Sequence, residues 1–214
     1  MWFSIQNTLV IIFGYPLSYV EFIGTATGLL SVWLATKSNI WTWPTGLLNV
    51  TCFFLIFFQV RLYADMFLQL YFFVTSIYGW VVWHNRTGYN MIDILSKNQR
   101  IKLLGVLVVS TAIIGVIVKN IHLIFPLVFS KPASYPFLDT FVAVLSIIAT
   151  ILLAQKKIEN WWLWIIADVI SVGLYAKKRV LFISIEYFVF LCLASVGLLM
   201  WLKIMRNEKR LSIG

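Results

Sequence analysis

Hydrophobic and polar positions follow one another along this chain in long blocks. Seven apolar runs are each long enough to cross a bilayer as a helix. The runs cover residues 17–36, 41–60, 65–84, 103–125, 138–155, 160–177 and 180–203. The pattern therefore predicts an all-α integral membrane protein with seven transmembrane helices.

The chain also resembles itself when it is shifted by 118 residues without a gap. The shift matches residues of unusual type, namely Glu21 with Asp139, Trp43 with Trp161, Arg61 with Arg179, Phe72 with Phe190, Gly79 with Gly197 and Trp83 with Trp201. Helices one to three thus correspond to helices five to seven. Because four helices separate the two starts, the repeats are parallel and related by an axis along the membrane normal, as in several transporters.

The repeat divides the chain into five parts. We expect an N-terminal interfacial segment (1–16), a first three-helix repeat (17–84), a connector with the fourth helix (85–137), a second three-helix repeat (138–203) and a cytoplasmic tail (204–214). The N-terminal residues have neither the basic start nor the small-residue cleavage site of a secretory signal.

Composition narrows the class of protein further. Hydrophobic residues make up 61% of the 214 positions and charged residues 12%, a balance that a soluble domain of this length does not show. The net charge of +9 reflects topology, because 11 of the 17 basic residues fall on the C-terminal side of the predicted membrane and 6 on the other. The positive-inside rule places the C-terminus in the cytoplasm and the N-terminus outside. Nucleic acid is not an expected partner.

The predicted sixth helix presents one unusual face. At 100° per residue, Trp161, Trp164, Asp168 and Tyr175 share a face of this helix, and Trp162 points away. Indole faces attract flat cations, and a carboxylate beside them pairs with positive charge, so this face suits a flat, cationic heteroaromatic molecule. Two alternatives stay open: the tryptophans form an interfacial belt, or Asp168 pairs with another helix.

Further polar positions complete the candidate binding site. The substrate-binding candidates outside the sixth helix are Asn49, Gln69, Phe72, Ser76, Glu186 and Tyr187. For Asn49 and Gln69 the alternative role is hydrogen bonding between helices. For Glu21, Asp139 and Glu186 the alternative is helix capping or packing.

Enzymatic signatures are absent from the sequence. It has no phosphate-binding glycine loop, no zinc-protease motif and no nucleophile elbow. Cys52 and Cys192 lie in apolar runs without metal-ligand spacing. We therefore expect no catalytic residues, no metal and no cofactor.

Two long stretches resemble the PnuC-type vitamin transporters. They are "WTWPTGLLNVTCFFLIFFQVRLYADMFLQLYFFVTSIYGWVVW" (41–83) and "ENWWLWIIADVISVGLYAKKRVLFISIEYFVF" (159–190), and the resemblance covers about residues 17–204. It implies seven helices arranged three, one, three, related to the SWEET sugar transporters, and a homotrimer. It further implies inward facilitated diffusion of nicotinamide riboside by alternating access, with the cargo trapped by a cytosolic kinase.

The family's binding motif W-x-x-W-x-x-x-N/D falls on Trp161, Trp164 and Asp168. Many nicotinamide riboside carriers have an amide where this chain has Asp168. An ionised aspartate only accepts hydrogen bonds and favours a cation, which suits nicotinamide riboside and also thiamine. A thiamine carrier of the same family is therefore the alternative prediction, and a membrane receptor without transport is the remaining one.

Overall fold

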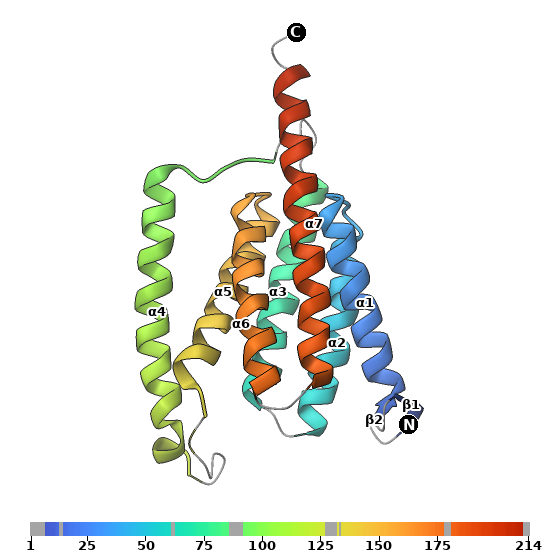
Figure 1. Cartoon of the computed structure of the whole chain (residues 1–214), viewed down its shortest axis with the longest axis vertical. Coiled ribbons are helices and arrows are strands. Elements are labelled where there is room, and N and C mark those ends of the chain that lie inside the picture. Colours follow the sequence, from blue (N-terminus) through green and yellow to red (C-terminus); the bar gives the residue numbers. More distant parts are fainter. Residues whose placement is uncertain are drawn as a thin grey trace.

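The structure, a computed structural model, describes residues 7–12, 15–60, 63–85, 92–126, 132, 134–177 and 181–211. Within this part the chain forms one hairpin and seven helices (Figure 1). The elements are β1 (Thr8–Ile12), β2 (Tyr15–Ser18), α1 (Tyr19–Thr36), α2 (Thr42–Gln59), α3 (Tyr63–Asn85), α4 (Lys97–Ile124), α5 (Pro136–Ala154), α6 (Glu159–Lys177) and α7 (Leu181–Leu211).

Six of the helices form a closed ring. Each packs against two neighbours, in the order α1, α2, α3, α5, α6, α7 and back to α1. In this ring α2 and α6 lie opposite each other, and their inner faces border a common interior. We call the end at which α7 projects beyond the others the C-terminal end, and the end with the hairpin the N-terminal end (Figure 1).

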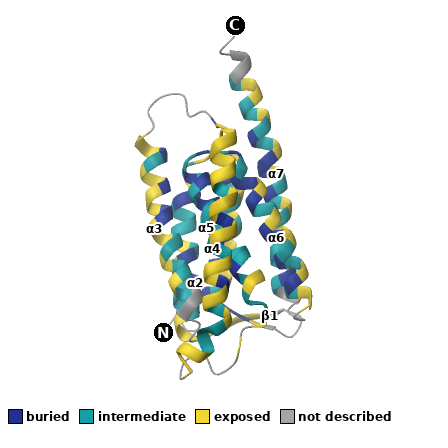
Figure 2. Ribbon diagram, turned by 90° about the vertical axis from the view of Figure 1, so that its left-hand side faces the viewer, coloured by how far each residue is buried: buried dark blue, intermediate teal, exposed yellow. Residues whose placement is uncertain are grey.

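Helix α4 lies outside the ring and, among the described elements, packs against α5 alone (Figure 1). Most of its residues are exposed (Figure 2). Many of these side chains are large and apolar, for example Leu104, Val108 and Ile113, each more than half exposed. A helix with apolar residues all around is expected to face lipid or another protein surface.

The helices confirm the expected class of an integral membrane protein. Five of those described are long and apolar enough to cross a membrane by themselves, namely Thr42–Gln59, Met66–Asn85, Lys97–Ile124, Pro136–Ala154 and Ile183–Glu208. The other two, α1 and α6, have 18 and 19 residues and complete the ring. Each of the seven runs predicted from the sequence corresponds to one helix.

The two three-helix units repeat each other in detail where the first helix of each unit ends. Ser38 and Lys156, which the shift of 118 places in register, both have a left-handed backbone, with φ of 53° and 56°. The amide of Ser38 donates to the carbonyl of Ala35, and the amide of Lys156 donates in the same way to that of Leu153. The sequence repeat is therefore a structural repeat.

A cluster of four tryptophans, which we call the tryptophan plug, fills the C-terminal end of the ring. Its members are Trp43, Trp83, Trp161 and Trp201, each at most 4% exposed. Each unit supplies one edge-to-face pair, with ring centroids 5.3 Å apart for Trp43 and Trp83 and 5.5 Å apart for Trp161 and Trp201. All six ring helices contribute residues to the surrounding apolar cluster, so this end of the interior is closed.

Two hydrogen bonds from the plug join one unit to the other. The indole Nε1 of Trp83 on α3 donates to the carbonyl of Ala154 on α5, at 3.0 Å. The indole Nε1 of Trp201 on α7 donates to the carbonyl of Ala35 on α1, also at 3.0 Å. Both acceptors lie in the last turn of a helix, where carbonyls lack partners within their own helix. The plug therefore links the two units at both of their contacts.

Replacing Gly197 by alanine is expected to lower the stability of the protein by about 1–3 kcal/mol, the usual cost of overpacking a core. A Cβ at this position would lie 2.6 Å from the ring of Trp161, which is buried against Trp201. Gly173→Ala on α6 is the matched control, because nothing lies within 4 Å of its Cβ position. Thermal unfolding in detergent measures both, and equal midpoints for the two variants would contradict the packing described here.

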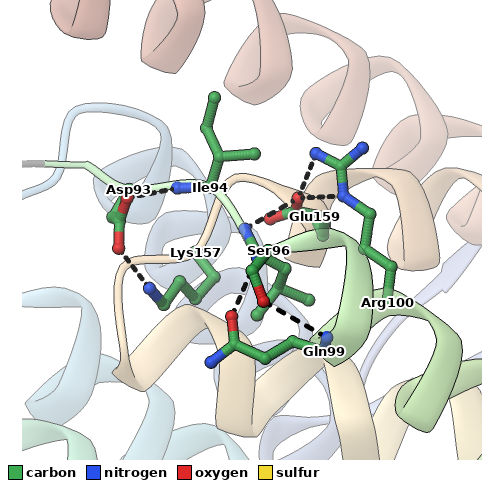
Figure 3. A network of polar contacts seen from close by, with 8 residues as sticks. Asp93, Ile94, Ser96, Gln99, Arg100, Lys157 and Glu159 are labelled. Carbon is green, nitrogen blue, oxygen red and sulfur yellow. Dashed lines mark hydrogen bonds and ion pairs between the residues drawn. The ribbon is translucent and has the colours of Figure 1, made fainter.

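The connector docks onto the turn between α5 and α6 (Figure 3). The amide of Ile158 donates to the carbonyl of Asp93, and Lys157 forms an ion pair with the Asp93 carboxylate, which holds the pKa of that carboxyl below its usual value. Glu159 accepts from the amide of Leu95 at 3.0 Å and pairs with Arg100 at 2.9 Å. These contacts fix the start of α4 beside the second unit.

Several helices begin or end at other residues than the apolar runs predicted. Helix α4 begins at Lys97, before the predicted residue 103, because Ser96 and Gln99 form a capping box. Helix α7 continues to Leu211, into the segment expected as a tail. The hairpin was not predicted, and Ser18 at its end caps α1 together with Glu21. Glu21 therefore has the capping role considered for it.

Candidate functional site

The middle of the ring contains acidic side chains and no basic ones. Helices α1, α2, α3 and α5 have no lysine or arginine, α6 has only Lys177 at its last residue, and the first in α7 is Lys203. Asp168 and Glu186 lie within this stretch. The electrostatic potential there favours a cation, because no positive side chain of these helices neutralises the two carboxyl groups.

Asp168 lies in the middle of α6. Its side chain is 3% exposed. Within the described part of the chain it has no hydrogen bond and no ion pair, so the predicted alternative of a partner on another helix is not seen. Asp168 follows Trp161 by seven residues, which places it about 10 Å deeper than the tryptophan plug. An unpaired carboxylate at such a position is costly, and residues of this kind mark binding sites in membrane proteins.

The two tryptophans of the α6 face have different surroundings. Trp161 is 1% exposed and belongs to the plug. Trp164 is only partly buried and packs against two apolar clusters, one around the plug and one between α5 and α6. Because its neighbours lie on both sides of α6, the indole of Trp164 faces the interior of the ring. Trp162 is 54% exposed and lies on the outer face, as expected.

The candidates on α7 lie between the centre and the N-terminal end. Glu186 lies beside Thr25 of α1, across the contact between the two units. Tyr187 stacks on Tyr175 of α6, with ring centroids 5.4 Å apart and an interplanar angle of 11°. Thr25 was not among the predicted residues, and no spacing in the sequence pairs it with Glu186.

The candidates of the first unit divide into two groups. The amide Nδ2 of Asn49 donates to the carbonyl of Gly24 at 2.8 Å, which is the helix-to-helix bond considered for it. Gln69, Phe72 and Ser76 follow one another at helical spacing along α3, and Ser76 is 7% exposed. Neither Gln69 nor Ser76 has a hydrogen bond from its side chain within the described residues. The donors and acceptors of these two side chains are therefore available to a ligand.

Comparisons with known proteins agree with this architecture. The family described as "Nicotinamide mononucleotide transporter" matches residues 18–203. The nicotinamide riboside transporter PnuC of Escherichia coli (strain K12) is 36% identical, over 96% of this chain and 96% of that protein. The riboflavin/roseoflavin transporter RibM of Streptomyces davaonensis is 21% identical, over 96% of this chain and 95% of its own.

A solved structure shows the same fold. The crystal structure of the vitamin B3 transporter PnuC matches with a TM-score of 0.68, covering 88% of this chain and 83% of that one, at 21% identity. The chain is thus a multi-pass membrane protein of a transporter family and not an enzyme. Because the family match runs from the start of α1 into α7, the chain belongs to the nicotinamide mononucleotide transporter family, and it shares the fold of PnuC.

Proposed function

We propose that this protein carries nicotinamide riboside across the bacterial inner membrane. The observation that carries this proposal is Asp168, a buried carboxylate that has no partner within the described structure and lies at a depth where the six ring helices have no lysine or arginine. Nicotinamide riboside has a flat, positively charged ring. The carboxylate attracts that charge, and the indole of Trp164 on the same face offers a stacking surface. The name of the E. coli relative supports the same substrate.

The charge of the ring interior also separates the three substrates that the names of the family and the relatives give, the riboside, the mononucleotide and riboflavin. A mononucleotide carries a phosphate, and phosphate sites in proteins depend on arginine, lysine or helix N-termini. The middle of the ring has no lysine or arginine. Riboflavin is uncharged and gains nothing from an unpaired carboxylate. The chemistry therefore favours the riboside over the mononucleotide and over riboflavin.

We assign the candidate residues to three positions. Trp164, Asp168, Gln69, Phe72 and Ser76 form the central site. Glu186, Tyr175 and Tyr187 form its border toward the N-terminal end. Trp161 forms its closed floor, and Asn49 holds α2 against α1.

Transport follows from alternating access of the two three-helix units. The units meet at two contacts, between α1 and α7 and between α3 and α5. Each contact has one indole hydrogen bond at the C-terminal end, so opening this end requires both bonds to break. The plug is then the gate on the side of the C-terminus.

Removing both indole donors, by Trp83→Phe with Trp201→Phe, is expected to loosen this gate. Phenylalanine keeps an aromatic ring but has no indole N–H. The carbonyl of Ala154 loses its indole donor, at a cost of about 1–3 kcal/mol for an unsatisfied group, and the carbonyl of Ala35 keeps only the amide of Ser38 as a donor. Hydrogen exchange at the ends of α1 and α5 should rise about tenfold or more. Trp162→Phe on the exposed face is the control. Unchanged exchange in the double variant would show that the plug is not a gate.

The remaining features of the proposal rest on the sequence and on the resemblance. The distribution of basic residues supports a cytoplasmic C-terminus and an external N-terminus. The resemblance supports facilitated diffusion, with the cargo retained through phosphorylation by a cytosolic kinase. The resemblance supports a homotrimer, and the apolar surface of α4 is available for such an assembly.

Thiamine is the second candidate, and Asp168 is the observation that favours it. The aminopyrimidine of thiamine has donors that an ionised carboxylate accepts, and its thiazolium ring is a cation. A titration of purified protein followed by tryptophan fluorescence separates the candidates. We expect saturable quenching by nicotinamide riboside and none by the mononucleotide. Saturable binding of thiamine alone would overturn the assignment.

A further inference from the structure

Helix α7 departs from the repeat at its C-terminal end. The shift of 118 residues pairs Lys203 with Asn85, the last residue of α3. Helix α7 instead continues to Leu211, about two turns further, and projects beyond the ring (Figure 1). The repeated three-helix fold does not require these extra turns, so they are expected to have a role of their own.

The inner and outer faces of this end of α7 differ in chemistry. Ile204 and Met205 pack against the apolar cluster around the tryptophan plug. Helical spacing places Glu208 on the same inner face. The outer face has a surface hollow of about 370 Å³, a volume in the range of small-molecule sites. This hollow is lined by Leu199, Leu202, Lys203, Arg206 and Asn207.

The basic side chains of the hollow are not neutralised within the described part of the chain. Lys203 and Arg206 are exposed and lie one turn apart. Neither of them, nor Asn207, has a hydrogen bond or ion pair with another described residue. Two cations at this spacing, with an amide beside them, can bind one phosphate group.

The hollow lies at the depth of lipid headgroups. The indole of Trp201 donates to Ala35 in the last turn of α1, so Trp201 is level with the end of α1. Lys203 and Arg206 follow about 3 Å and 8 Å further along the helix axis. The headgroup layer on each side of a bilayer is about 5–8 Å thick. The two cations therefore lie at the level of the lipid phosphates, and Leu199, which is 67% exposed, lies beside the acyl chains.

We propose that the hollow binds one acidic phospholipid from the leaflet on the C-terminal side, the cytoplasmic leaflet in the proposed orientation. Its phosphate pairs with Lys203 and Arg206, and one acyl chain covers Leu199 and Leu202. Basic pockets at this depth bind acidic headgroups in other membrane proteins. A free phosphate ion gains nothing from the leucines, and a soluble acidic protein does not reach Leu199 at the depth of the hydrocarbon. The site does not depend on which substrate the ring carries.

Native mass spectrometry of the detergent-purified protein, titrated with lipid, tests this site. We expect saturable binding of phosphatidylglycerol, weaker binding of phosphatidylcholine and none of soluble glycerol phosphate. Lys203→Gln with Arg206→Gln should weaken phosphatidylglycerol about 25-fold, because each basic residue near an anionic headgroup contributes about fivefold. Lys97→Gln with Lys102→Gln on α4 is the matched control, since both lysines are exposed on the same side of the membrane and do not line the hollow.

Three outcomes would overturn the proposal. Equal weakening by the two double variants would show that the lipid responds to overall charge and not to the hollow. Glycerol phosphate binding as tightly as the lipid would identify a site for free phosphate. Binding of polyglutamate in place of the lipid would identify a surface for an acidic protein.

A further variant tests the apolar part of the hollow. Leu199→Ser should weaken phosphatidylglycerol about fivefold, because the acyl chain loses an apolar contact. Leu199 is 67% exposed, so its replacement should leave the thermal unfolding midpoint unchanged. Leu48→Ser on α2, where the side chain is 48% exposed, is the control and should leave lipid affinity unchanged. Equal lipid affinities of the two serine variants would contradict the placement of the acyl chain.

Discussion

Replacing Asp168 by valine is expected to weaken binding of nicotinamide riboside by about 10- to 100-fold and to make the protein more stable. The loss of affinity corresponds to one charge-assisted hydrogen bond, about 1.5–3 kcal/mol. The gain in stability follows because the carboxylate is 3% exposed and has no partner within the described structure, so its removal relieves an unfavourable burial. Valine is a suitable replacement because Val50 occupies the equivalent position of the first unit.

Fluorescence titration and thermal unfolding measure the two effects on the same sample. Asp168→Asn is the matched control, because it keeps the shape and one acceptor oxygen but removes the charge. We expect its affinity to lie between those of wild type and Asp168→Val. A valine variant that binds normally, or that unfolds at a lower temperature, would mean that Asp168 supports the fold and not the substrate.

The second large effect is expected for Trp164→Ala, which should weaken substrate binding by about 1–3 kcal/mol, the scale of a lost stacking or cation–π contact. Trp164 is the partly buried tryptophan of the face that contains Asp168. The ring is also packed against two clusters, so Trp164→Phe is the companion variant that keeps an aromatic surface. Phenylalanine should restore part of the affinity.

Trp162→Ala is the control on the opposite face of α6, where the indole is 54% exposed. Its removal should not change affinity. Isothermal titration of each purified variant gives the dissociation constants. If a folded Trp164→Ala variant binds as tightly as wild type, the indole belongs to the packing of the ring and the stacking surface lies elsewhere.

Much of the fold could be predicted from the sequence. Each apolar run forms a helix in the structure. The shift of 118 residues identified two units whose equivalent turns have the same hydrogen bond, donated by the amide of Ser38 in one and by that of Lys156 in the other. The start of α4 at Lys97 could also be predicted from the sequence, because Ser96 and Gln99 have the spacing of a capping box. The hairpin was not, since its strands are short and lie within an apolar stretch.

The candidate site was only partly predictable, because helical spacing identifies a face but not what covers it. Trp161 and Trp164 share a face, yet Gly197 lets Trp161 pack closely against α7, edge to face with Trp201. Asn49 similarly found its partner in a backbone carbonyl of α1.

The central claim is that this ring carries a cationic riboside and no phosphorylated form of it. Uptake of radiolabelled substrate into vesicles containing the purified chain tests it most directly. The account predicts saturable entry of nicotinamide riboside that stops when inside and outside concentrations are equal, and no entry of nicotinamide mononucleotide. Entry of the mononucleotide at a comparable rate, or riboside entry no faster than into empty vesicles, would contradict it.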